Sequence, residues 1–317
     1  MAKRDLGARV SGTLTIGIDL GGTRVKAGVV DAAGAIVARR VEAVGADKDG
    51  AAVVARLAGV ITGLQQECGL PVAAVGLAAA GVLDRARGVI CESPNFPAWR
   101  DLALGRHLEA AVGLPVSLDN DANAVIYGEA RAGAGRGAVN VVGFTLGTGV
   151  GGGIVLDGRL WRGTRGMAGE LGHITVVPEG RPCGCGNRGC LEQYAGAVGL
   201  RQGLRDAGGD LARMADAPDA PERMAAQARA GNSRLRDIFD VMGDALGQAI
   251  ATVVHTLDVQ RIVLAGGLAP TADLFMPALT ATFHARTFRS MAQGVRVLTG
   301  ELGEDAGVVG AAIGCAR

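Results

Sequence analysis

One histidine and three cysteines lie close together in the chain, between two acidic residues. The histidine and cysteines are His173, Cys183, Cys185 and Cys190, and the flanking residues are Glu170 and Glu192. An imidazole and three thiolates suit the tetrahedral preference of zinc, and protein side chains then fill all four positions. The segment therefore predicts a closed zinc site that holds a loop in shape and does not activate water.

Two other interpretations of this segment are a disulfide and an ordinary histidine. Cys183 and Cys185 are too close in the sequence for an ordinary bridge, and residues 1–12 lack the apolar core of a secretory signal. A lone histidine is more often a core or surface residue, but the three cysteines downstream of His173 favour a metal ligand.

A second group of polar residues stands where an apolar strand meets a helix, within residues 116–130. Asp119, Asn120, Asp121 and Asn123 form this group. At least one of them is expected to cap the helix, but four exceed what a cap needs. Polar groups at the carboxyl end of a strand commonly face a ligand, and a carboxylate there can accept a proton from a hydroxyl nucleophile. The group therefore predicts a general base beside an orienting amide.

Three glycine turns, each at a strand end, suggest a phosphate-binding role. Asp19 stands just before the turn at residues 21–23, and similar turns occur at residues 147–149 and 266–267. Glycines let backbone N–H groups approach phosphate oxygens, and Asp19 is suited to hold magnesium against them. Gly-Gly turns are also common hairpin connections, so the first turn alone is a weak signal. Neither a Walker A motif nor a dinucleotide-binding glycine motif is present, so a different nucleotide fold is expected.

Apolar periodicity predicts the elements that position these groups. Residues 14–43 are expected to form a meander of strands, residues 51–67 a helix, and residues 198–257 a helical section broken near residue 217. Residues 16–30 and 142–156 share a strand, turn, strand pattern, which indicates two related halves. The expected class is an α/β fold with a ligand cleft between two lobes.

Composition limits the partners and the location of the chain. Its 317 residues suffice for two domains, and a net charge of +1 with 3% aromatic residues gives no case for nucleic acid or a membrane surface. The remaining cysteines, Cys68, Cys91 and Cys315, are scattered, which favours reduced thiols and a cytoplasmic protein.

These motifs together resemble the ROK family of sugar kinases and sugar-responsive repressors, and above all its bacterial ATP-dependent glucokinases. The resemblance covers nearly the whole chain, and its most specific part joins AGELGH to CGCGNRGCLE at residues 168–192. It implies a two-lobed actin-like ATPase fold, built from duplicated ribonuclease H-like halves around a central cleft. The small lobe is expected at residues 1–118 and 303–317, and the large lobe, with the zinc loop and the helical section, at residues 119–302.

The resemblance also implies a role for each candidate residue. Asp121 is expected to take the proton from the 6-hydroxyl of the sugar. The sugar-binding residues would be Asn95, Asn120, Asp121, Glu170, His173 and Glu192. The residues around ATP and magnesium would be Asp19, Gly21, Gly22, Thr23, Lys26, Thr148, Gly149, Gly266 and Gly267.

Several alternatives stay open at this point. Other hexoses and N-acetylhexosamines differ from glucose at single ring positions that one sequence does not distinguish. A sugar-sensing repressor of the family would carry an additional N-terminal DNA-binding domain, whereas the first strand here is expected near residue 14. Polyphosphate-using members generally lack the cysteine block, which favours ATP as the donor. The dimers and tetramers of the family predict a homo-oligomer.

Overall fold

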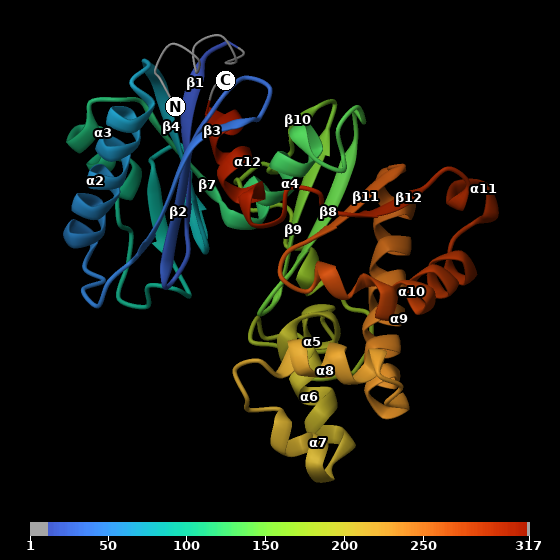
Figure 1. Cartoon of the computed structure of the whole chain (residues 1–317). Helices are drawn as coiled ribbons and strands as arrows, with labels where there is room; N and C mark the ends of the chain where they lie inside the picture. Colours follow the sequence, from blue (N-terminus) through green and yellow to red (C-terminus); the bar gives the residue numbers. More distant parts are fainter. Residues whose placement is uncertain (1–11, 316–317) are drawn as a thin grey trace. The chain divides into compact units, whose positions relative to one another are not determined.

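The computed structural model describes residues 12–315, which form two compact units (Figure 1). The first unit contains the chain up to Val139, Gly153–Gly169 and the chain from Glu301 on. The second contains Asn140–Gly152 and Glu170–Gly300. Helix α4 (Asp121–Ala132) thus belongs to the first unit, whereas the resemblance implies residues 119–302 for the other lobe.

A five-stranded sheet forms the centre of the first unit. Its strands follow the order β3 (Ile36–Ala43), β2 (Arg24–Val30), β1 (Leu14–Leu20), β4 (Val72–Ala79) and β7 (Val116–Asn120). Strands β1 to β3 form an antiparallel meander, and β4 and β7 continue the sheet in parallel with β1. The carboxyl ends of β1, β4 and β7 therefore lie at one edge of the sheet, where Asp19 and Asn120 are found.

Helices cover both faces of this sheet (Figure 1). Helix α2 (Gly50–Cys68) and helix α3 (Leu104–Val112) cover one face, and α4 and α12 (Ala306–Cys315) cover the other. Asp49 caps α2 by accepting from the N–H of Ala51, and Gly69 ends it in the left-handed conformation. A Cβ atom on Gly17 of β1 would lie 1.9 Å from the carbonyl oxygen of Val308 in α12. Only glycine permits this helix to pack so closely on the strand.

The second sheet repeats the order of the first. It runs β10 (Arg159–Leu160), β9 (Val150–Leu156), β8 (Val141–Leu146), β11 (Arg261–Ala265) and β12 (Arg296–Thr299), and the chain passes between the units within β9. Strands β8, β11 and β12 are parallel, as are β1, β4 and β7. The repeated order agrees with the two related halves predicted from residues 16–30 and 142–156.

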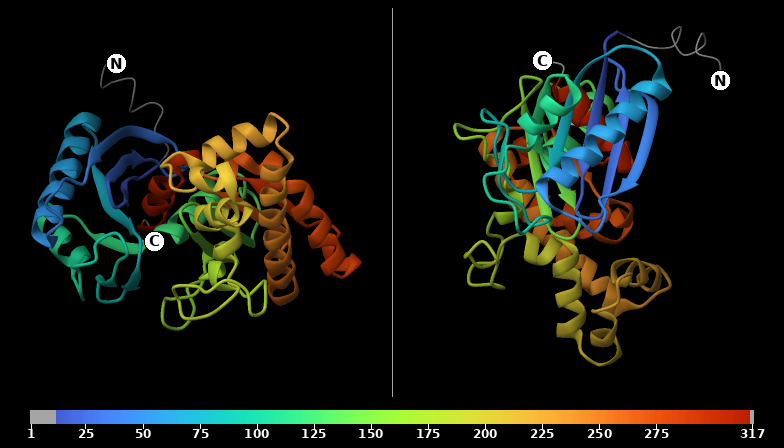
Figure 2. Two further views of the ribbon diagram at one scale, coloured as in Figure 1. Left: turned by 90° about the horizontal axis from the view of Figure 1, so that it is seen from below. Right: turned by 90° about the vertical axis from the view of Figure 1, so that its left-hand side faces the viewer.

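Two long helices pack side by side in the second unit (Figure 2). They are α9 (Ser233–Leu257) and α10 (Ala272–Arg286). A Cβ on Gly243 of α9 would lie 2.2 Å from the carbonyl oxygen of Phe275 in α10, so glycine sets this close approach. The shorter helices of this unit are α5 (Glu192–Ala195), α6 (Ala197–Ala207), α7 (Gly209–Met214), α8 (Ala220–Arg229) and α11 (Arg289–Ala292).

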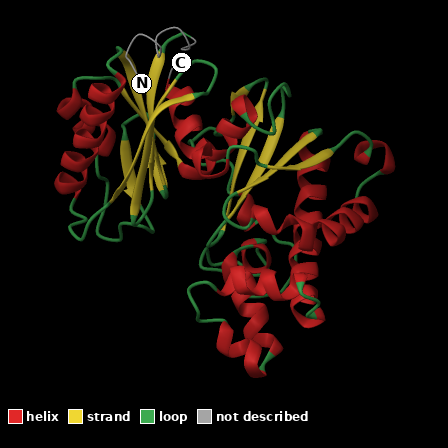
Figure 3. Ribbon diagram, in the orientation of Figure 1, coloured by secondary structure: helices red, strands yellow, loops and turns green. Residues whose placement is uncertain are grey.

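Most of the elements predicted from apolar periodicity are confirmed. The hairpin at residues 14–30, the helix α2 and the broken helical section from residue 198 to 257 all form. The segment from residue 161 to 191 contains little regular structure, only the single turn η1 (Leu171–His173), and Figure 3 draws it mainly as loop. No helix within residues 12–315 is long and apolar enough to cross a membrane.

Candidate functional site

The polar residues where β7 meets α4 have different roles, one as a helix cap and one as a carboxylate at the start of the helix. Asn120 is the helix cap, and its Oδ1 accepts from the N–H of Asn123 at 3.2 Å. Asp121 is the first residue of α4, and its Oδ1 accepts from the N–H of Ala122 at 2.9 Å. The prediction that one of these residues caps the helix is confirmed, and Asp121 is left as the carboxylate that begins it.

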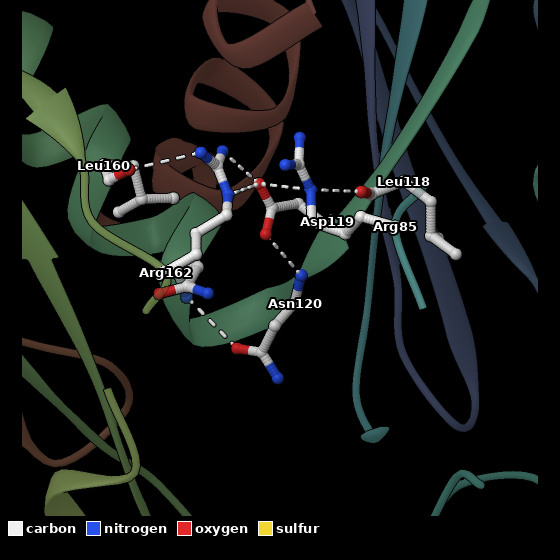
Figure 4. Close-up of polar contacts among 7 residues, drawn as sticks. Arg85, Leu118, Asp119, Asn120, Leu160 and Arg162 are labelled. Carbon is white, nitrogen blue, oxygen red and sulfur yellow. Dashed lines mark hydrogen bonds and ion pairs between the residues drawn. The ribbon is translucent and has the colours of Figure 1, made fainter. Parts of the chain in front are cut away.

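Asp119 points into an ion-pair cluster with two arginines distant in the sequence (Figure 4). Its Oδ2 accepts from the Nε of Arg162 at 3.0 Å and lies 3.4 Å from the Nε of Arg85. Arg85 also donates to the carbonyl oxygen of Leu118 at 2.9 Å. No local motif marks these two arginines, because they lie 34 residues before and 43 residues after Asp119 in the chain.

Asp19 and Asp121 are two partly buried carboxyl groups of the first unit whose charges interact. Burial raises the pKa of Asp121. Burial, and then the charge of Asp121, raise the pKa of Asp19 to about 6, against a smaller lowering by Lys26. Two carboxylates that both resist ionisation provide a place for a cation, because a divalent ion would favour both charged forms.

The first glycine turn lies against a predicted sugar-binding residue. The backbone N–H of Gly21 donates to the carbonyl oxygen of Arg24 and closes the turn. A Cβ on Gly22 would lie 3.2 Å from the Oδ1 of Asn95. Asn95 and the turn are therefore neighbours, although more than 70 residues separate them in the chain. Lys26 lies 3.1 Å from Glu304 through its Nζ atom, so part of its charge is already paired.

A further glycine next to Asp19 has a role that no local sequence motif indicates. A Cβ on Gly307, near the start of α12, would lie 3.1 Å from the Oδ2 of Asp19. The side chain of Asp19 thus occupies the space that any larger residue at position 307 would need. Only a three-dimensional contact reveals this requirement, because the two residues lie at opposite ends of the chain.

The second glycine turn, in the second unit, contacts Glu192. The Oε2 of Glu192 accepts from the N–H of Val150 at 3.2 Å, and a Cβ on Gly149 would lie 2.0 Å from that oxygen. Thr148 is exposed at the tip of the turn.

The third glycine turn begins with Gly266, which follows β11 with φ of +90°. A Cβ on Gly266 would lie 2.6 Å from the carbonyl oxygen of Leu146. The adjacent Gly267 has open space around its α-carbon.

The predicted metal ligands are brought together in the second unit. One ligand atom from each of His173, Cys183, Cys185 and Cys190 lies within 4.8 Å of all the others. The Sγ atoms of Cys185 and Cys190 are 3.7 Å apart, which is much longer than a disulfide bond of about 2.05 Å. Thiolates on one zinc, each about 2.3 Å from it, would be about 3.8 Å apart. The donor set and its spacing therefore fit a tetrahedral ion.

The two nitrogen atoms of His173 face different partners. Its Nδ1 lies 3.6 Å from the Sγ of Cys183, on the side of the thiols. Its Nε2 lies 3.9 Å from the Oε2 of Glu170, a carboxylate whose side chain is 67% exposed. A metal on Nδ1 would fix the tautomer and orientation of the ring, and Nε2 would then present a proton beside Glu170.

Comparison with known proteins matches residues 15–316 to the family model described as the ROK family. This chain belongs to the ROK family. A glucokinase of Streptomyces coelicolor is 36% identical over 313 residues, covering 94% of this chain and 96% of the relative. A ROK hexokinase from Thermus thermophilus has a TM-score of 0.85 at 34% identity, covering 95% of this chain and 97% of the other. A ROK glucokinase from Streptomyces griseus, solved with glucose and AMPPNP, has a TM-score of 0.79 at 36% identity and covers 94% of this chain and 98% of the other.

The ROK-family chain thus carries two groups of candidate residues, each held within one unit. In the first unit, Asp19 and Asp121 interact through their charges, and Gly22 lies against Asn95. The second unit brings the four predicted metal ligands together with Glu170, and Glu192 against the turn at Gly149.

Proposed function

We infer that this protein is an ATP-dependent hexokinase that phosphorylates the 6-hydroxyl of glucose. The observation that carries the proposal is Asp121, a carboxylate with a raised pKa at the start of α4, whose charge acts on Asp19. The similarity to a glucokinase over nearly the whole chain supports glucose as the acceptor.

Asp121 is proposed as the general base. A carboxylate accepts the proton of a sugar hydroxyl best when its pKa is raised toward the working pH, and burial has this effect on Asp121. The hydrogen bond from Ala122 fixes one of its oxygens and leaves the other for the hydroxyl. Phosphoryl transfer requires mainly positioning and charge neutralisation, so this orientation of the base matters as much as its basicity.

The remaining sugar contacts are proposed for each unit by itself. In the first unit, Asn95 and Asn120 would bind sugar hydroxyls, with Asn120 using its Nδ2, because its Oδ1 caps α4. In the second unit, Glu170, His173 and Glu192 are the proposed sugar-binding residues. Carboxylates that accept from sugar hydroxyls, and a ring N–H that donates, suit a polyol whose hydroxyls both donate and accept.

ATP is proposed to bind at the glycine turns. Backbone N–H groups at Gly22 and Gly149, with the hydroxyls of Thr23 and Thr148, would face phosphate oxygens. The N–H of Gly21 donates to the carbonyl oxygen of Arg24, so Gly21 would shape the first turn. Gly266 and Gly267 would lie near the nucleoside, and Lys26 would add positive charge. Asp19 fits magnesium, because burial and then the charge of Asp121 raise its pKa, and a cation beside it would favour its ionised form. The ion, when bound, would neutralise phosphate charge.

A structural zinc ion is proposed for the cluster of His173, Cys183, Cys185 and Cys190. Burial raises the pKa of the Cys190 thiol to about 12, with further contributions from the neighbouring cysteines. A thiol in such surroundings ionises readily only when a cation is bound beside it. The ion would hold the loop and aim His173 and Glu170 toward the sugar, with no chemical step of its own.

The direct test is an assay of the purified protein with ATP, magnesium and a panel of sugars. Glucose, mannose, allose, N-acetylglucosamine and N-acetylmannosamine form the panel, and kcat/KM is measured for each. We expect glucose 6-phosphate as the product and the highest kcat/KM for glucose. Failure to phosphorylate any of these sugars would refute the kinase proposal, and a higher kcat/KM for an N-acetylated sugar would reassign the acceptor. The same assay with polyphosphate identifies the phosphoryl donor.

A further inference from the structure

The first unit contains an arginine-rich cavity outside the residues assigned to sugar and ATP. Its volume is about 600 Å³, and residues of α4, the end of α12, the turn around β10 and the turn after β5 (Val82–Asp84) line it. Four of its lining residues are Arg85, Arg131, Arg159 and Arg162. None of the residues proposed above for glucose, ATP or metal ions lines it.

Two of these arginines share a single carboxylate. Figure 4 shows the side chains of Arg85 and Arg162 converging on Asp119. The Nε of Arg162 donates to Oδ2 at 3.0 Å, and the Nε of Arg85 is 3.4 Å from the same oxygen. Both arginine side chains are partly buried, at 32% and 22% exposure. One negative charge thus balances only one of two guanidinium groups.

The other two arginines that line the cavity add further positive charge. Arg131 and Arg159 are exposed, and within residues 12–315 no hydrogen bond or ion pair engages either guanidinium group. Asp157 lines the cavity and Asp119 binds two of its arginines. Among residues 12–315, four guanidinium groups and these two carboxylates leave an excess of two positive charges.

The positive charges of the cavity are not fully compensated. Burial lowers the pKa of Arg85; Asp119 opposes this effect, and the neighbouring charge of Arg162 adds to it. Like charges gathered in one partly enclosed space repel one another, and a bound anion would relieve this repulsion. The surroundings therefore favour binding of a negative ligand over leaving the cavity to water.

We propose that this cavity is a binding site for a small phosphorylated anion, separate from the proposed substrate site. The planar fork of an arginine matches a phosphate group in a bidentate manner, and a phosphate dianion supplies the two negative charges that the cavity lacks. The volume lies within the range of about 300–1,000 Å³ that is typical of small-molecule sites. The inference depends only on the first unit and does not depend on the proposed kinase reaction.

Isothermal titration of pyrophosphate and of glucose 6-phosphate into the protein tests this site. Saturating glucose, AMPPNP and magnesium are present, so that the proposed substrate site is already filled. The test variant carries Arg131→Ala and Arg159→Ala, two exposed changes. The control is Arg106→Ala, an exposed arginine of α3 that does not line the cavity.

We expect at least one of the two anions to bind the wild type and the control equally, and the double variant at least 10-fold more weakly. Tighter binding of glucose 6-phosphate would identify a phosphate ester as the ligand class, and tighter binding of pyrophosphate a free phosphate. Equal affinity for wild type and double variant, or no binding to the wild type at millimolar concentration, would overturn the proposal. Citrate binding as tight as that of either phosphate compound would also overturn it, because the site would then not select phosphoryl groups.

Discussion

The Nδ1 atom of His173 lies 3.6 Å from the Sγ atom of Cys183. A metal at this point would hold the imidazole by one nitrogen and leave the other, beside Glu170, free to contact a ligand. The loop that contains the cysteines would thus act on sugar binding through the orientation of one ring.

Loss of one thiol is therefore expected to impair sugar binding more than ATP binding. In Cys185→Ser, zinc content measured by elemental analysis should fall, and KM for glucose should rise about 10-fold or more, with a smaller change in KM for ATP. Cys91→Ser changes a cysteine outside the cluster and should leave both values as in the wild type. An equal rise of both KM values in Cys185→Ser would show that the cluster supports the fold in general.

Asp19 is expected to destabilise the folded protein when magnesium is absent. Its pKa is about 6 in the folded state against an ordinary value of 3.8, so the folded state binds the proton more tightly than the unfolded state. The free energy of unfolding therefore falls as pH rises from about 3.8 through about 6. Above that range the ionised Asp19 lowers it by its full amount, at most about 3 kcal/mol.

Asp19→Asn removes the buried carboxylate and with it this destabilisation. The substitution should therefore raise the free energy of unfolding, measured with urea in EDTA, more at pH 8 than at pH 5. The same substitution should reduce the protection that magnesium and ATP give against unfolding. A variant less stable than the wild type at pH 8 would argue against the raised pKa of Asp19.

Glu129 is expected to contribute strongly to stability through a buried network. Its carboxylate is fully buried and accepts from the backbone N–H groups of Ala134, Glu301 and Leu302 at 2.9–3.0 Å. Glu129→Gln places an amide N–H against these donors and should lower the free energy of unfolding by about 3 kcal/mol. Glu222→Gln, at an exposed glutamate of α8, should change it by less than about 0.5 kcal/mol. Similar unfolding midpoints for the two variants would refute the role of Glu129.

Much of the fold could be predicted from local patterns. The strands, the cap at Asn120, the helix α2 and the cysteine cluster each carry a signal within a few residues, either in periodicity or in ligand type. The repeated strand, turn, strand pattern also predicted two related halves, and the two sheets indeed have the same strand order. Interactions between residues that are close in the chain determine these features, so a single sequence is sufficient to predict them.

The roles of several other residues depend on contacts between distant parts of the chain and could not be predicted from local patterns. Arg85 and Arg162 meet at Asp119, Gly307 makes room for Asp19, and Glu129 binds the backbone 172 residues away. Each of these residues is an ordinary arginine, glycine or glutamate in its own segment. Their roles follow from the packing of whole elements, which periodicity does not encode.

Turnover by Asp121→Asn tests the central claim most directly, because this substitution removes the proposed base and keeps the size of the side chain. We predict that kcat with glucose and ATP falls by about 10² to 10⁴. Binding of glucose and AMPPNP, measured by calorimetry, should change less than about threefold, and the unfolding midpoint should not fall, because the change also removes a buried charge. A variant that retains wild-type kcat would contradict the assignment of Asp121 as the general base.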